Sequence, residues 1–459
     1  MKETTTEQNK NKFGHWLRTS ITARMLTVGF LIIVLLIPLA YIGDLIIERK
    51  NRQQDVITEI NNQWGKEVLI NGPVFKVPYK VYTEKTVTDA KTKRVYTETI
   101  EEIKNAYFYP ELLNIQSSIN PEEKKRGIYT TAVYNSSIVL TGKFKKPDFS
   151  EIDITDEQIL WNKARVIIQT SNLKGVYEAS LKLNNINYPL NSKYNSQDIT
   201  YQGYVRLHNL ESQALKVSET EFINDLDFNI DFSIKGSEQI RFVPIGKETE
   251  ARITSNWKDA NFFGEFLPYN EDKITETGFD AKWKILDFNR GFAQQHFGYL
   301  PDLREFAFGV NFMIPVDQYQ QSERSVKYGF LVIALTFLVF FLIQTLSNIP
   351  IHPFQYLMIG LALTMFYTLL VSISEHSNFF KAYLIAGISV VALISLYSKS
   401  ILKINKFPIF IALSLSALYT FIYVIIQLEN YALLVGSIGL FLILATIMYV
   451  SRKIDWQHS

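Results

Sequence analysis

The segment 328–374 reads YGFLVIALTFLVFFLIQTLSNIPIHPFQYLMIGLALTMFYTLLVSIS and contains no Asp, Glu, Lys or Arg. Three further uncharged runs follow, at 382–398, 407–428 and 430–451. A helix needs about 20 mainly apolar residues to cross a bilayer, and these runs divide into lengths of about that size. Burying them in a soluble core would leave no polar face for water. The sequence therefore predicts an integral membrane protein with a five-helix transmembrane bundle in residues 327–450.

An apolar run near the N-terminus adds a sixth predicted span. Residues 1–24 form a polar tail with several basic side chains, and residues 25–47 form the predicted anchor helix. This run is longer than the apolar region of a signal peptide, which has about 7–15 residues, and we find no small-x-small cleavage motif after it. We therefore expect an uncleaved transmembrane anchor.

The distribution of basic residues predicts the orientation. Six spans place both termini on one side of the membrane. The N-terminal tail, the loop with Lys399, Lys403 and Lys406, and the tail 451–459 are basic. Positive loops stay in the cytoplasm. We expect both termini to be cytoplasmic and the long segment 48–326 to face outward.

Residues 48–326 are polar and show the period-two alternation of half-buried strands. The segment 228–234 alternates Phe and Ile with polar residues, and 240–245 is its expected return strand. Asn-Gly-Pro at 71–73 predicts a turn before a strand at 75–81, with a hairpin partner at 91–100. In contrast, we expect 121–126 to be helical or irregular. The fold prediction is an α-helical membrane protein with a large β-rich domain inserted between spans one and two.

Several classes of chemistry lack support in the sequence. The chain has no cysteine, which excludes disulfides and thiolate metal sites. Its net charge of +2 gives no argument for nucleic acid. No histidine pair has metal-ligand spacing, and no phosphate-binding loop or hydrolase motif occurs. We therefore expect no cofactor, no metal and no catalytic residue.

The pair Glu375-His376 is the acid–histidine pair at a predicted membrane boundary. A functional interpretation makes it a proton relay or a metal or substrate contact, because ionisable groups at membrane depth are costly. The favoured interpretation is structural, because the pair follows the third span, where both side chains can reach water.

Two other groups of residues are candidates for interaction or coupling. The segment 315–324 joins the predicted outer domain to the bundle and contains Tyr319, Glu323 and Arg324. It either transmits a conformational signal or forms a polar collar with an aromatic belt at the headgroups. Glu323 and Arg324 could pair with each other or with lipid headgroups. The second group consists of Gly72 and Pro73, which we expect to set a turn, and Pro78 and Tyr79, which we expect in an edge strand.

Several stretches together resemble the CreD family of bacterial inner-membrane proteins. GPVFKVPY at 72–79 is similar to the element that follows the family's first span, and PVDQYQQSERSVKYG at 315–329 is the strongest match. Further matches, in order along the chain, are RGIY at 126–129, GFDAKW at 278–283, His352-Pro353, Ser374-Glu375-His376 and the C-terminal segment 431–456.

The resemblance implies a multi-pass inner-membrane protein with a periplasmic domain, linked to envelope integrity, colicin tolerance and a sensor-kinase system. Its implied partners are membrane lipids and an envelope component or another membrane protein. The leading hypothesis is a non-enzymatic envelope-integrity or stress-response protein. The alternatives are a transport or lipid-handling protein that uses the C-terminal bundle, and an enzyme that uses Glu375 or His376.

Overall fold

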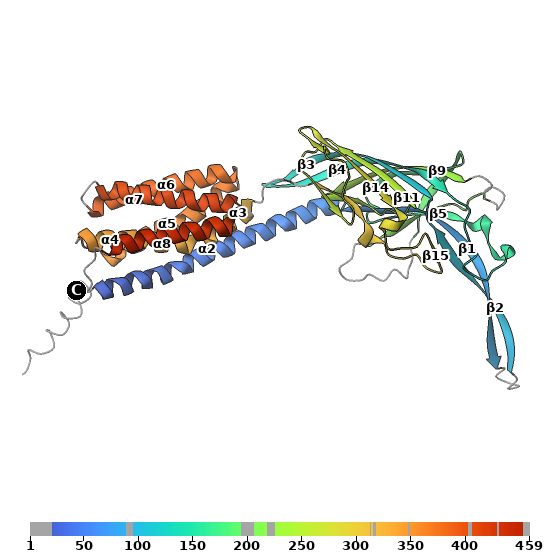
Figure 1. Cartoon of the computed structure of the whole chain (residues 1–459), viewed down its shortest axis with the longest axis horizontal. Helices are drawn as coiled ribbons and strands as arrows, with labels where there is room; N and C mark the ends of the chain where they lie inside the picture. Colours follow the sequence, from blue (N-terminus) through green and yellow to red (C-terminus); the bar gives the residue numbers. More distant parts are fainter. Residues whose placement is uncertain are drawn as a thin grey trace, which may run out of the picture. The chain divides into compact units, whose positions relative to one another are not determined.

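The chain forms two compact units (Figure 1). One combines Met1–Gln54 with Val316–Ser459, and we call it the helical bundle; the other is Asp55–Pro315, the β domain. The structure is a computed structural model that describes residues 21–88, 95–193, 206–217, 225–312, 314, 318–347, 349–402, 406–428 and 431–452.

Six helices within these ranges are long and apolar enough to cross a membrane. One is N-terminal and five are C-terminal, so the predicted architecture is confirmed. A shorter helix, α3 (Gln318–Lys327), precedes the five. The six helices are α2 (Ile21–Trp64), α4 (Gly329–Ser347), α5 (Pro353–Ser374), α6 (Phe379–Leu402), α7 (Lys406–Gln427) and α8 (Ala432–Ser451).

Glycines let α2 pack closely against α4 and α5. A Cβ atom at Gly360 would lie 2.0 Å from Leu35 Cδ1, and one at Gly329 would lie 2.7 Å from the Leu39 methyl carbons. Small residues at such crossings are typical of membrane helices, because association there depends on close van der Waals packing. Leu35 is 1% exposed, so the anchor helix is an integral part of the bundle core.

The β domain is built on one connected, mainly antiparallel sheet around an aromatic core that includes Phe75, Phe144, Phe232 and Trp283. The pairs β1–β10 and β3–β11 are parallel. Its strands within the described residues are β1 (Val68–Thr88), β2 (Val95–Phe108), β3 (Leu112–Arg126), β4 (Tyr129–Phe144), β5 (Arg165–Thr170), β6 (Val176–Leu183), β7 (Ile186–Lys193), β8 (His208–Ser212), β9 (Leu226–Ser237), β10 (Gln239–Phe242), β11 (Glu248–Ser255), β12 (Ala260–Gly264), β13 (Ile274–Thr275), β14 (Gly278–Leu286), β15 (Gln295–Phe297) and β16 (Phe308–Phe312).

The end of α2 is fixed in the β domain by Trp64. Its indole Nε1 donates a hydrogen bond to the Tyr134 carbonyl oxygen at 3.4 Å. The ammonium groups of Lys124 and Lys235 lie 4.7 and 5.3 Å from the centre of the indole ring, within the range of cation–π attraction. One continuous helix therefore takes part in both units.

The predicted hairpin of the first two strands is confirmed, since β1 and β2 pair antiparallel from Phe75↔Phe108 to Thr88↔Val95. Figure 1 shows this ribbon projecting from the rest of the β domain. Residues 91–94 of the expected partner lie outside the described residues.

Two local predictions are wrong. Asn71-Gly72-Pro73 is not a turn; it forms a bulge within β1, where the register with β5 shifts between Asn71 and Val74. The segment 121–126 is neither helical nor irregular, because it continues β3 in register with β4 from Pro121↔Tyr134 to Arg126↔Tyr129. In both places pairing with neighbouring strands overrides the local preference of the sequence.

The expected return strand at 240–245 has a different partner. A strand does form there, β10, but it pairs with β1 and β16 instead of turning back on β9. β9 pairs with β4 and β6. The alternation of apolar residues therefore predicts that a strand forms, whereas adjacency in the sequence does not predict which strand it pairs with.

Candidate functional site

Charged and polar side chains from three helices meet at the end of the bundle where α5 ends. Two come from α2, three from α3 and one from the C-cap of α5. We call them the polar cluster: Arg49, Lys50, Tyr319, Glu323, Lys327 and Glu375.

Glu375 is the most enclosed charge of the polar cluster, with 15% of its side chain exposed. The Tyr319 hydroxyl donates a hydrogen bond to Glu375 Oε1 at 3.2 Å, and an Arg49 guanidinium nitrogen lies 3.8 Å from the same oxygen. Tyr319 is itself buried. A cation from α2 and a hydroxyl from α3 therefore contact the same carboxylate oxygen of Glu375.

Glu323 links α2 to α3. Lys327 Nζ lies 3.0 Å from Glu323 Oε1, and Lys50 Nζ lies 3.5 Å from Oε2. The hydrogen bond from Lys327, supported by the charge of Lys50, lowers the pKa of the Glu323 carboxyl. Glu323 therefore pairs with two lysines and not with its neighbour Arg324.

Helical spacing in the sequence predicts that part of this cluster lies on one helix face. Tyr319, Glu323 and Lys327 lie four residues apart, which puts them on one face of α3. Arg49 and Lys50 follow the apolar part of α2 after Glu48. The chain passes between the two units after Gln54 and before Val316, so both passages lie close in sequence to cluster residues.

The other predicted residues of the bundle are peripheral. Arg324 is half-buried in the last turn of α3, and the side chain of His376 is exposed just after α5. The backbone N–H of His376 donates to the Ile373 carbonyl, as expected at a helix end. No group of three or more His, Asp or Glu with a metal-binding arrangement occurs among the described residues.

The predicted residues of the β domain occupy β1. Gly72 has φ +148°, and a Cβ there would lie 3.0 Å from Ile168 Cα, so the bulge requires glycine. Pro73 follows it through a cis peptide bond. Pro78 lies just beyond the last β1–β5 pair, and its carbonyl accepts a hydrogen bond from the Leu160 N–H. Tyr79 is buried, with its ring edge-on to aromatic side chains of the core.

A buried cation in the β domain was not predicted. Arg290 is 7% exposed, and its guanidinium donates to the carbonyl oxygens of Ile245, Gly246 and Phe292 and to the Gln294 side chain. Burial lowers the pKa of Arg290 to about 10. No short motif marks such a residue, because its partners are backbone carbonyls brought together by the fold.

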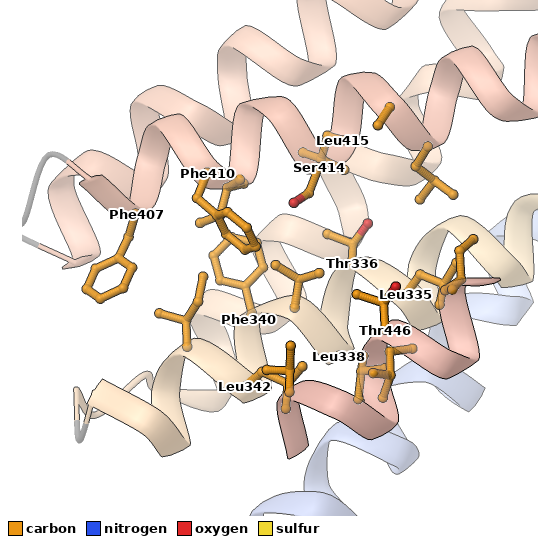
Figure 2. Close-up of a pocket in the computed structure, with 18 of the residues that line it drawn as sticks. Leu335, Thr336, Leu338, Phe340, Leu342, Phe407, Phe410, Ser414, Leu415 and Thr446 are labelled. Carbon is orange, nitrogen blue, oxygen red and sulfur yellow. The ribbon is translucent and has the colours of Figure 1, made fainter. Parts of the chain in front are cut away.

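An apolar groove opens at the other end of the bundle, between α4, α7 and α8 (Figure 2). Its volume is about 860 Å³, and its walls are mainly Leu, Ile, Val and Phe side chains. Figure 2 shows Leu338 and Leu342 of α4 and Phe407 and Phe410 of α7 along the groove, with Thr446 of α8. No sequence pattern predicts it, because an apolar helix face that lines a groove has the same composition as one that contacts lipid.

Comparison with known proteins shows which family has this architecture. The model of the family described as "Inner membrane protein CreD" matches residues 20–457. The chain belongs to the CreD family. It is 30% identical over 445 residues to the inner membrane protein CreD of Escherichia coli (strain K12), a match that covers 96% of this chain and 94% of the relative. The predicted family is thus confirmed, and with it a multi-pass protein of the inner membrane.

Proposed function

We propose that this CreD-family protein is a non-enzymatic component of envelope integrity and stress response. In this proposal the β domain lies in the periplasm and binds an envelope component, and both termini are cytoplasmic. The family match over residues 20–457 carries the proposal. The basic segments of the sequence, Lys399 to Lys406 and the C-terminal tail, support the orientation.

The polar cluster supports a role in coupling. Arg49 and Lys50 lie five residues or fewer before the passage into the β domain at Gln54, and Tyr319 follows the return at Val316. Their contacts with Glu375 and Glu323 tie both connecting segments to the bundle. A movement of the β domain that pulls on either connecting segment would act on these contacts before it reaches the rest of the bundle. The cluster therefore suits the transmission of ligand binding from the β domain to the helices.

The role is tested in a strain that lacks the gene. We expect it to lose viability at concentrations of detergents and wall-active agents that the parent tolerates, and the wild-type gene to restore growth. Glu375→Gln should restore it only in part, whereas Glu48→Gln, an exposed glutamate of the same helix α2 as Arg49, should restore it fully. Normal resistance of the deletion strain under every stress would contradict the proposal.

The ligand is tested with the full-length protein in detergent, incubated separately with isolated peptidoglycan and with lipopolysaccharide. Retention by one of the two supports the proposal and identifies the component class. Retention by neither, nor by any other isolated envelope fraction, contradicts a binding role for the β domain.

The orientation is tested by cysteine labelling, which the chain permits because it has no native cysteine. Ser150 of the β domain and Ser400 near the end of α6 are both exposed. In intact cells with a permeabilised outer membrane, a membrane-impermeant maleimide should label Ser150→Cys but not Ser400→Cys. The reverse pattern would contradict the proposed orientation.

Transport or lipid handling is the second candidate function, and the groove between α4, α7 and α8 favours it. A lateral groove of this kind suits a lipid chain, since its walls offer mainly apolar contacts. Purified protein in vesicles should then speed the movement of a labelled phospholipid between leaflets. An unchanged rate would contradict this candidate.

A further inference from the structure

We infer that the groove between α4, α7 and α8 holds one acyl chain of an anionic phospholipid, with the lipid phosphate near Lys406. The inference deepens the lipid-handling candidate because it names the lipid class and its site. It does not depend on that candidate, since a lipid that stays bound without crossing the membrane satisfies it.

The first argument is the position of the groove in the membrane-spanning part. α4, α7 and α8 are all apolar enough to cross a bilayer. Among the lining residues, the Thr336 and Thr446 hydroxyls donate to carbonyls of their own helices, Val332 and Leu442. Apolar cavities do not hold water. The occupant within a bilayer is therefore hydrocarbon.

The second argument is the packing of α8, which has no buried residue. At Gly439, the eighth of its 20 residues and part of the groove lining, α8 approaches α7 closely, because a Cβ there would lie 2.2 Å from the Phe421 ring. Further along, from Leu442 to Val450, it lines the groove opposite α4 and α7. A helix without buried side chains gains little from packing on its neighbours, and an acyl chain in the groove supplies the missing contacts.

The third argument is length. Along α7 the groove reaches from Lys406 to Phe421, and at about 1.5 Å per residue this is about 22 Å. The hydrocarbon core of a bilayer is about 30 Å thick, so one leaflet takes about half of that. The groove is long enough for one fully extended chain that enters at the Lys406 end.

The fourth argument is charge, which selects the headgroup. Lys406 is the one charged residue among the described residues that line the groove. It is exposed at the first position of α7, where the positive end of the helix dipole also attracts anions. The apolar walls of the groove fit an acyl chain, and Lys406 at its end fits an anionic headgroup. Phosphatidylglycerol combines both.

The test is native mass spectrometry of the full-length protein in detergent, titrated with phosphatidylglycerol or phosphatidylcholine of the same chain composition. Wild type should bind one phosphatidylglycerol more tightly than any further lipid. Lys406→Gln should weaken that binding about fivefold, the equivalent of about 1 kcal/mol per basic residue at an anionic surface. The matched control Lys399→Gln, an exposed lysine at the end of α6, should leave it unchanged.

A second variant fills the groove. Ser414→Phe places a ring inside it, and we expect binding of both lipids at this site to fall at least tenfold. Ser389→Phe adds the same ring on an exposed face of α6 and should have no effect. If Ser414→Phe does not fold, Thr446→Phe on α8 fills the groove from the opposite wall. Equal binding by the groove and control variants, or equal affinity of wild type for both lipids, overturns the inference.

Discussion

The β domain and the helical bundle hold a charged side chain in different ways: Arg290 is buried, whereas Glu375 is partly exposed. In the β domain, Arg290 is buried without a carboxylate in hydrogen-bond contact, and its guanidinium donates hydrogen bonds to backbone carbonyls. In the bundle, Glu375 is paired with a cation and a hydroxyl from two other helices. The first arrangement fixes one loop region within a sheet structure. The second joins three helices, so it can respond when any of them moves.

This difference predicts separate effects on stability and on the proposed coupling. A charge held by carbonyls has one favourable geometry, because the carbonyls belong to a fixed backbone. A charge held by flexible side chains at the edge of a membrane bundle contributes less stability and can exchange partners. We therefore expect substitutions at Arg290 to affect folding most and substitutions at Glu375 to affect coupling most.

The largest effect is expected for Arg290→Met. The substitution leaves the carbonyls of Ile245, Gly246 and Phe292 without their donor, and a buried unpaired polar group costs about 1–3 kcal/mol. We expect the free energy of unfolding of the β domain to fall by about 3 kcal/mol in urea titrations of the full-length protein, followed by circular dichroism.

The control for Arg290 is Arg252→Met. Arg252 is exposed and makes a two-pronged ion pair with Asp280, so its loss should cost at most about 1 kcal/mol. If both variants lose the same free energy of unfolding, the buried Arg290 stabilises the β domain no more than an exposed ion pair does. That result would contradict the expected difference between the two kinds of charge.

A smaller effect on stability is expected for Glu375→Gln, about 1 kcal/mol, because the amide keeps an acceptor for Tyr319 but loses the attraction to Arg49. Tyr319→Phe should cost a similar amount alone and less in the Glu375→Gln background, since the two share one contact. Thermal unfolding in detergent measures both. Strict additivity would show that the two side chains act independently.

The sequence predicts the parts of the fold that follow from local pattern. A helix that crosses the bilayer must be long and apolar, so uncharged runs such as 407–428 are recognised directly as transmembrane helices. The bulge at Gly72 was missed because Asn-Gly-Pro favours a turn in isolation, while pairing of β1 with β10 and β5 keeps it in the sheet. The extension of β3 to Arg126 was missed for the same reason.

The candidate site divides in a similar way. The sequence predicts Glu323 and Glu375 as candidates because charge beside a span is rare, and Tyr319 because an aromatic residue there suits the headgroup region. Their partners Arg49 and Lys50 come from a helix near the other end of the chain, and nothing local links them. The groove depends on the distance between α8 and α4. The sequence of one helix does not predict its distance from another.

A weak effect with a defined sign is expected at Glu323. Its lowered pKa means that its ion pairs stabilise the folded state above the pKa of an unfolded glutamate, about 4.3, and that this contribution is lost as the pH falls further. Lys327→Gln should lower the stability at pH 7 by about 0.4 kcal/mol and reduce this acid dependence. An unchanged acid limb would contradict the pairing.

The smallest effect is expected at His296, which lies in β15 beside the buried ring of Tyr109. Burial lowers the pKa of His296, so the folded β domain favours neutral imidazole. The unfolded chain binds the proton with a pKa of about 6.5, so stability should fall as the pH drops from there toward the folded pKa. In His296→Gln this part of the pH dependence should disappear. The exposed His376 gives the control, because His376→Gln leaves the β domain untouched and should keep it. Loss of the slope in both variants would contradict the assignment of this pH dependence to the half-buried His296.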